Sequence, residues 1–207
     1  MLRDRLKEWS QSAPGVVHAA VDVKQWIERR PEVDVVRPAC CPWCGAAGRP
    51  GGAPIGMVGH GVRSRQVRGP TEPGEEPRGH VIEVRRYRCR TCGRTVTVVP
   101  RGVVERRHYS AWAMALACWL WSFGHLSLGE VRRLVAPGRT DEPGWAAMGR
   151  WLRAVGAGRL FRCVRPWPAG FVPRQRAERV AATVMALAPA ADGSAPARLF
   201  AGAALAA

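Results

Sequence analysis

The sequence CPWCG at residues 41–45 is matched by CRTCG at residues 89–93, and this pair of motifs decides how the middle of the chain folds. Each motif places two cysteines three positions apart and follows them with a glycine. Two thiolates from one tight turn can reach a single cation, and the glycine supplies the positive φ with which such a turn closes. Two such turns complete the tetrahedral shell of a structural zinc ion. The expected ligands of one Zn²⁺ per chain are Cys41, Cys44, Cys89 and Cys92.

Other interpretations of the cysteines stay open. Cys40 competes for the first ligand position, although the spacing repeated in the second motif favours Cys41. The thiols could also be free, or the metal could be iron in a rubredoxin-like site. A histidine could replace a cysteine, and the candidates are His60, His80 and His108. A shell closed by four protein ligands has no open position, so we expect a structural and not a catalytic metal.

Between and after the two motifs, the chain has the composition of short β-strands. The runs GHGVRSRQVRGP and HVIEVRRYRCRTCGRTVTVV are rich in Val, Ile, Thr, Tyr and Arg, and a Pro/Gly-rich turn region separates them. The 44 residues between the cysteine pairs fit two β-hairpin arms that extend from the metal, which is the layout of a zinc ribbon. We assign residues 40–107 to this ribbon. Residues 1–39 are expected to form an N-terminal arm with short helical pieces, LRDRLKEW and VDVKQWIERR.

The chain is strongly basic, and the charge is concentrated in its middle. It carries 32 Lys+Arg against 16 Asp+Glu, a formal net charge of +16. Residues 60–128 hold 12 basic against 5 acidic side chains, and residues 129–180 hold 11 against 4. Such an excess predicts a polyanionic partner, and nucleic acid is the usual one. We interpret the arginines of the expected hairpins as phosphate contacts, although a solvated charged face has the same pattern. They are Arg63, Arg65, Arg68, Arg85, Arg86, Arg88, Arg106 and Arg107.

Three helices are predicted over residues 108–160. Ser110 can cap a helix that runs to Phe123, and SLGE at residues 127–130 is a capping box that opens a short helix through Val135. The apolar part of the first helix is about 13 residues long, against the roughly 20 that a membrane span requires. We therefore expect a buried helix and no membrane segment.

The third helix, from about Trp145 to Val155, divides into two faces. One face is apolar, and the other carries small residues together with Arg150 and Arg153. This division is typical of the recognition helix of a helix-turn-helix, whose arginines reach phosphates or guanine edges. An ordinary amphipathic helix with a solvated arginine face fits the pattern equally well. Residues 161–207 are expected to form a Pro/Ala-rich tail with one helix near residues 174–187.

The order of these parts resembles the zinc-ribbon plus helix-turn-helix N-terminal region of bacterial transposases and their short helper proteins. The phrase RYRCRTCGRT at residues 86–95 and RWLR at residues 150–153 are the most characteristic pieces, and the resemblance covers roughly residues 38–158. It implies binding of double-stranded DNA at element ends or regulatory sites, with the four cysteines as metal ligands. A separately encoded transposase catalytic protein is an implied partner.

The sequence thus predicts an α+β protein in which a small zinc-ribbon module precedes a helix-turn-helix-like domain. We expect no enzymatic activity, because strand transfer needs convergent carboxylates and only Glu178 and Asp192 follow Glu142. The charged N-terminus does not read as a signal peptide, so a cytoplasmic location is expected. The alternative functions are a chromosomal transcription regulator, a zinc-ribbon protein-interaction module and an RNA-binding protein. The sequence does not indicate an oligomeric state.

Overall fold

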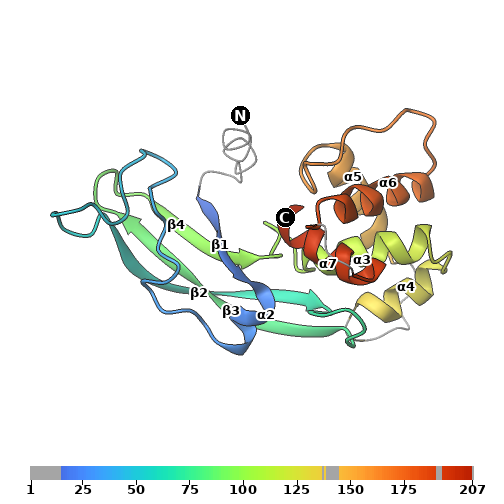
Figure 1. The fold of residues 1–207 in the computed structure, drawn as a ribbon, viewed down its shortest axis with the longest axis horizontal. Helices are drawn as coiled ribbons and strands as arrows, with labels where there is room; N and C mark the ends of the chain where they lie inside the picture. The colour runs from blue at the N-terminus through green and yellow to red at the C-terminus, as the bar shows by residue number, and fades with distance from the viewer. Residues whose placement is uncertain (1–14, 137, 139–144, 190–192, 207) are drawn as a thin grey trace. The chain divides into compact units, whose positions relative to one another are not determined.

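The computed structural model describes residues 15–136, 138, 145–189 and 193–206 (Figure 1). The protein has the α+β composition predicted from its sequence. The chain divides into two compact units that are both discontinuous in sequence. Unit 1 comprises Met1–Arg65 and Val81–Arg101, and unit 2 comprises Gln66–His80 and Gly102–Ala207.

Unit 1 is built on a mixed β-sheet. Within the described residues, four strands lie in the order β1-β4-β3-β2 (Figure 1). β1 runs parallel to β4, and β3 runs antiparallel to β4. Valine is frequent in these strands because β-branched side chains suit a pleated, half-buried surface. The strands are β1 (Val16–Asp22), β2 (Met57–Gly69), β3 (Arg78–Cys89) and β4 (Thr95–Arg101).

The stretch before the first cysteine motif belongs to this sheet. Val16–Asp22 is a strand that was not predicted from the sequence, and its β-branched valines pair with β4. The predicted helical piece at residues 21–30 overlaps this strand only at its first two residues. The helical prediction is right for α2 (Val23–Glu28), which Asp22 caps by accepting a bond from the N–H of Gln25 at 2.8 Å. The other predicted piece, residues 2–9, lies outside the described residues.

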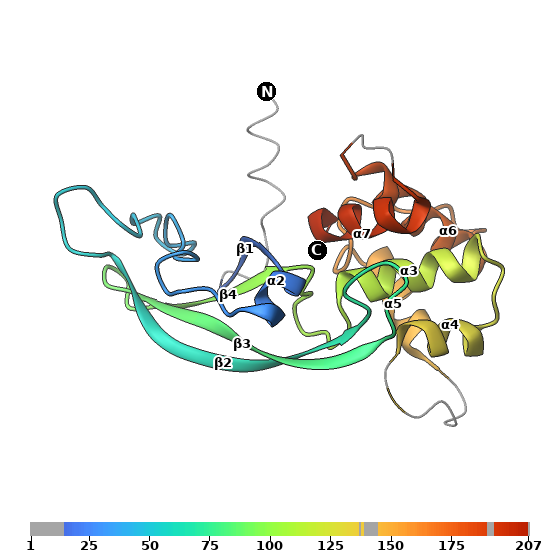
Figure 2. The same ribbon diagram turned by 60° about the horizontal axis from the view of Figure 1, so that its bottom comes forward.

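Helix α2 covers one face of the sheet (Figure 2). The indole N–H of Trp26, a fully buried side chain, donates to the carbonyl of Glu83 at 3.0 Å. The loop that follows α2 continues this cover, because the Arg85 guanidinium and the Tyr87 hydroxyl donate to the carbonyls of Pro31 and Val33. The side chains of β3 that face α2 and its loop are therefore Arg85 and Tyr87, together with the next residue of the same parity, Cys89.

Unit 2 is helical around a buried central helix, α3. Every residue of α3 from Ala111 to Cys118 is buried, and α3 packs against each of the four other helices. As predicted, Ser110 caps α3 by accepting from the N–H of Ala113 at 3.0 Å, and Ser127 and Glu130 form the capping box of α4. No helix in the described residues is long and apolar enough to cross a membrane. The helices are α3 (Ala111–Ser122), α4 (Leu128–Val135), α5 (Ala147–Gly156), α6 (Pro173–Ala186) and α7 (Ala195–Ala206).

The last two helices pack closely on each other. A Cβ atom added at Gly202 of α7 would lie 1.8 Å from the carbonyl oxygen of Val184 in α6, so only glycine permits this contact. Helix α6 matches the predicted tail helix within a residue or two, whereas α7 was not predicted. The expected loop between the second and third helices, residues 136–144, lies largely outside the described residues.

Candidate metal centre

Two cysteine pairs that are far apart in sequence meet in unit 1. Their Sγ atoms all lie within 4.8 Å of one another, and two of the separations, Cys41 to Cys92 and Cys44 to Cys89, are 3.7 Å. With a Zn–S distance of about 2.3 Å, a tetrahedral shell has S···S edges of about 3.8 Å. Four thiols at this spacing fit one thiophilic metal ion such as Zn²⁺.

The two cysteine turns have the same backbone hydrogen bonds. The N–H of Cys41 donates to the carbonyl of Ala46 at 2.8 Å, and the N–H of Gly45 donates back to Cys41 at 2.9 Å. In the second turn, the corresponding bonds join Cys89 to Arg94 and Gly93 to Cys89, each at 2.9 Å. Both glycines have positive φ, +74° and +71°, as the motifs predict. The turns are therefore fixed by their own backbones before any metal is added.

The thiols differ in how readily they ionise. Hydrogen bonds from the backbone N–H groups of Cys92 and Thr91 lower the pKa of Cys89 to about 6. For Cys44, the backbone N–H of Ala46 favours the thiolate, but desolvation and the neighbouring thiols outweigh it and raise the pKa to about 12. A thiolate at Cys89 is a ready first ligand, and a dication bound there would displace the proton of Cys44.

Cys40 lies outside the cluster. It is exposed and forms an isolated β-bridge with Ala47, and the group of four thiols includes neither it nor any histidine. Cys118 is buried in α3 with its sulfur 4.0 Å from that of Met148, and burial raises its pKa to about 12. Both are therefore unsuited to the metal site, in agreement with the preference for Cys41 over Cys40.

A cation–π contact joins the two cysteine turns. The guanidinium of Arg94, which follows the second turn, lies 4.3 Å from the ring centroid of Trp43 in the first. The N–H of Arg90 also donates to the carbonyl of Gly56, 2.9 Å away, and so ties the second turn to the residue just before β2. Neither link was predicted from the sequence. The only available signal was a Trp in one motif and an Arg after the other.

The predicted nucleic-acid contacts on β3 fall on opposite faces of the sheet. Arg85 donates twice to the carbonyl of Pro31, at 3.0 and 2.8 Å, so its guanidinium is held against the loop after α2. Arg86 and Arg88 pair with Thr97 and Thr95 of β4, and their side chains lie on the other face. On this second face, called the open face below, Arg88 is exposed, and Arg86 and the two threonines, Thr95 and Thr97, are half-buried.

The remaining predicted contacts have varied environments. In unit 1, Arg63 is exposed and Arg65 is half-buried. In unit 2, Arg68 is half-buried and donates to the side chain of Gln66 at 3.1 Å. Arg106 is exposed beside the carboxylate of Glu105, with its Nε 3.6 Å away, and Arg107 is half-buried.

Helix α5 has the two faces that the sequence predicted. Arg150 and Arg153 are exposed, as is Ala146 just before the helix, while the opposite side is buried. The buried residues of the predicted apolar face are Met148, Trp151, Leu152 and Val155. Arg150 and Arg153 thus project from one solvent-facing side of unit 2.

Comparison with models of protein families, with curated proteins and with solved structures gives no match to this chain. Function must therefore be inferred from the chemistry of the thiol cluster and of the exposed arginines. Four thiols can fill the four ligand positions of one Zn²⁺, which would leave no position for a substrate.

Proposed function

We propose that the protein is a non-catalytic, double-stranded DNA-binding protein whose unit 1 is held together by a structural zinc ion. The observation that carries the proposal is the path of β3. This strand presents Arg86 and Arg88 on an open face and ends in the cluster residue Cys89. A metal bound there would fix the strand that presents the basic side chains.

The open face of β3 and β4 suits a phosphate backbone. Arg86 and Arg88 lie on the same side of one strand, about 7 Å apart along it. Arginine forms bidentate bonds to phosphate, and threonine hydroxyls such as those of Thr95 and Thr97 add further donors. Such contacts position a protein on a duplex without reading its sequence, so unit 1 would supply affinity and orientation.

Helix α5 would supply sequence reading. Its exposed arginines, Arg150 and Arg153, are about one turn apart, and Gly149 lies beside Arg153 on the same part of the helix surface. A helix with small residues can enter the major groove closely, and arginine there binds the guanine edge. In this proposal α5 is the recognition helix, and α4 is the helix that precedes it in a helix-turn-helix.

The biological setting proposed here is a mobile element. The support is the motif order that resembles transposase-associated proteins, from RYRCRTCGRT to RWLR. On this basis the protein is a cytoplasmic helper or regulator that binds element DNA beside a separately encoded catalytic protein. A chromosomal regulator would share the same DNA-binding chemistry, and flanking inverted repeats in the surrounding DNA would favour the element.

The test is fluorescence anisotropy of a labelled mixed-sequence duplex, titrated with the full chain at several salt concentrations. The logarithm of the association constant should fall with the logarithm of salt by about 0.9 per phosphate contacted. The double variant Arg86→Gln/Arg88→Gln should lower that slope by about 2. Arg150→Gln/Arg153→Gln should in addition reduce discrimination between duplexes of different sequence.

A matched control removes the same charge elsewhere. Arg165 and Arg198 are exposed in unit 2 and lie outside the proposed contacts, so Arg165→Gln/Arg198→Gln should change the slope little. Equal salt slopes in the β3 variant and this control would mean that binding depends only on the net charge of the protein. That result would refute the proposal that the face of β3 contacts DNA. If duplex RNA competes more strongly than duplex DNA, the protein binds RNA and the proposal of DNA binding is wrong.

A further inference from the structure

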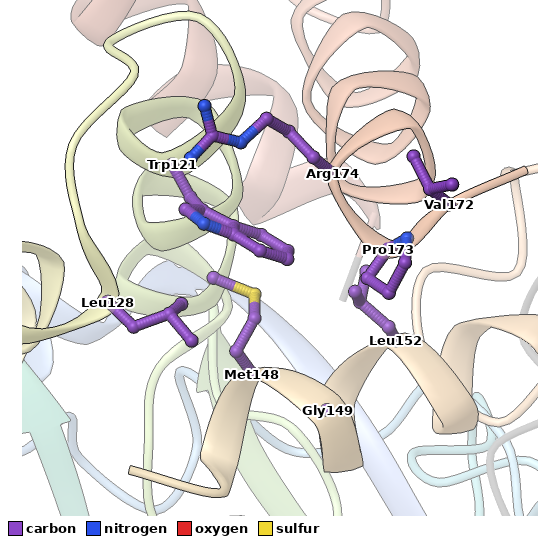
Figure 3. Close-up of a pocket in the computed structure, with 8 residues that line it drawn as sticks. All are labelled: Trp121, Leu128, Met148, Gly149, Leu152, Val172, Pro173 and Arg174. Carbon is purple, nitrogen blue, oxygen red and sulfur yellow. The ribbon is translucent and has the colours of Figure 1, made fainter. Parts of the chain in front are cut away.

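Unit 2 contains an apolar groove between α3, the start of α4, α5 and the start of α6 (Figure 3). Its volume is about 470 Å³, and its walls include Trp121, Leu128, Met148, Leu152 and Pro173. Protein interiors rarely leave voids larger than a water molecule, whereas small-molecule sites occupy about 300–1,000 Å³ and are mostly apolar. The groove therefore has the size and lining of a ligand site.

The apolar walls extend to the solvent. Leu128 is 37% exposed and Val172, the residue just before α6, is 54% exposed. A third wall residue, Gly149, leaves part of α5 uncovered, because a Cβ added there would meet only the far end of the Arg153 side chain. A glycine inside a helix is about 1 kcal/mol less favourable than an alanine, and no neighbouring backbone requires one here. The hollow is thus kept open where a larger residue would be sterically tolerated.

Two guanidinium groups border the groove. Arg174 reaches from α6 towards Trp121, with its guanidinium carbon 5.7 Å from the ring centroid and NH1 3.3 Å from Nδ1 of His125 (Figure 3). The second is Arg153, whose NH1 would lie 3.4 Å from a Cβ at Gly149. Among the described residues that line the groove, none is acidic. The charge at the groove therefore complements an anion.

We propose that this groove binds a small amphipathic carboxylate. The apolar body would occupy the space between Trp121, Met148 and Leu152, and the carboxylate would accept hydrogen bonds from the guanidinium of Arg174, with Arg153 adding positive charge nearby. An apolar ligand with a single anionic group matches both the lining and the charge of the site. The groove shares Gly149 and Arg153 with the surface of α5 proposed to contact DNA, whereas Arg174 lies outside the proposed DNA contacts. Substitution of Arg174 therefore tests ligand binding separately from DNA binding.

The test uses isothermal titration calorimetry of the full chain with three probes. Decanoate carries the apolar tail and the negative charge, decylammonium carries the same tail with a positive charge, and acetate carries the charge alone. Decanoate should bind at one site per chain, and acetate should give no measurable binding. Decylammonium should bind at least about tenfold more weakly, because it loses a charge-assisted hydrogen bond and meets two cations.

Two variants locate the site. Gly149→Leu should fill the groove and abolish decanoate binding without unfolding α5, because leucine is the better helix former. Arg174→Gln should weaken the binding of decanoate about tenfold and should not weaken the binding of decylammonium. Ala201→Leu, at an exposed position of α7, is the control and should change nothing.

Several outcomes would overturn the proposal. Equal binding of decanoate and decylammonium, or decanoate binding that survives Gly149→Leu, would mean that these probes associate elsewhere as detergents. Absence of decanoate binding to the unmodified chain would rule out a small carboxylate and leave a segment of a partner protein as the occupant of the groove.

Discussion

Replacement of Cys89 by serine tests whether the thiol cluster stabilises unit 1. Cys89 is fully buried at the end of β3, and its N–H donates to the carbonyl of Arg94. Serine is close in shape to cysteine, so Cys89→Ser removes a thiolate with little steric change. The matched control is Cys40→Ser, which removes an exposed thiol outside the cluster.

The expected effect is large. Structural zinc contributes an apparent 10–16 kcal/mol or so to small metal-dependent domains. One ligand in four therefore accounts for about 3 kcal/mol, and Cys89→Ser should weaken zinc binding by at least about 100-fold. Complete removal of the metal would cost as much as the entire stability of a typical domain, about 5–15 kcal/mol. Unit 1 should then lose its protected structure.

Hydrogen exchange with mass spectrometry reads the two units separately. When a chelator is added, or in Cys89→Ser at limiting zinc, amides of β3 and β4 should lose protection by a factor of about 10³ or more, as expected for a loss of about 4 kcal/mol. Amides of α3 and α6 should keep theirs, because those helices lie in unit 2. Unchanged protection of β4 after chelation would refute a stabilising metal, and a loss of zinc in Cys40→Ser equal to that in Cys89→Ser would refute the assigned ligand set.

Four further substitutions test the packing and capping described above. Tyr87→Phe should destabilise unit 1 by about 1–3 kcal/mol in urea unfolding, because the carbonyl of Val33 loses its donor. Gly202→Ala should destabilise unit 2 by about 1–3 kcal/mol through a clash with α6. The same change at Gly149 should stabilise unit 2 by up to about 1 kcal/mol, because no backbone lies close to that position. Changes in the free energy of unfolding that have the same sign for both variants would contradict the close contact at Gly202. The capping box holds the pKa of Glu130 below its ordinary 4.5, so its contribution to α4 should be present above pH 4.5 and lost as the pH falls through the lowered pKa. Glu130→Gln should remove that acid-dependent loss of amide protection in α4, and an unchanged pH profile would exclude the cap as its cause.

The sequence predicts the cluster of four cysteines well because its determinants are local. The spacing of two cysteines and a glycine fixes a turn without reference to the rest of the chain, and the two turns, at Cys41 and Cys89, have identical hydrogen bonds. The caps at Ser110 and Ser127 are local in the same sense, so the starts of α3 and α4 are found to within a residue. Local signals of this kind need no knowledge of tertiary partners.

Features set by distant partners were missed. β1 pairs in parallel with β4, about 80 residues later in the chain, and a strand whose partner lies so far away carries no periodic signal of its own. The role of Arg85 was equally hidden, since the carbonyl of Pro31 becomes its partner only when the loop after α2 folds onto the sheet. Helix α7 is rich in alanine and has little amphipathic contrast, so its pattern did not separate it from a Pro/Ala-rich tail.

The alternation of side chains along β3 explains how a metal without contact to DNA could still control binding. Arg85 and Tyr87 point to one face and anchor the strand to the loop after α2, while Arg86 and Arg88 point to the other. Cys89 ends the same strand and belongs to the cluster. Loss of the metal would free the end of β3 that carries the open arginines, so in our proposal DNA affinity and zinc content fall together. Substitution of Arg86 and Arg88, by contrast, should lower affinity and leave zinc content unchanged, which separates a contact from a scaffold.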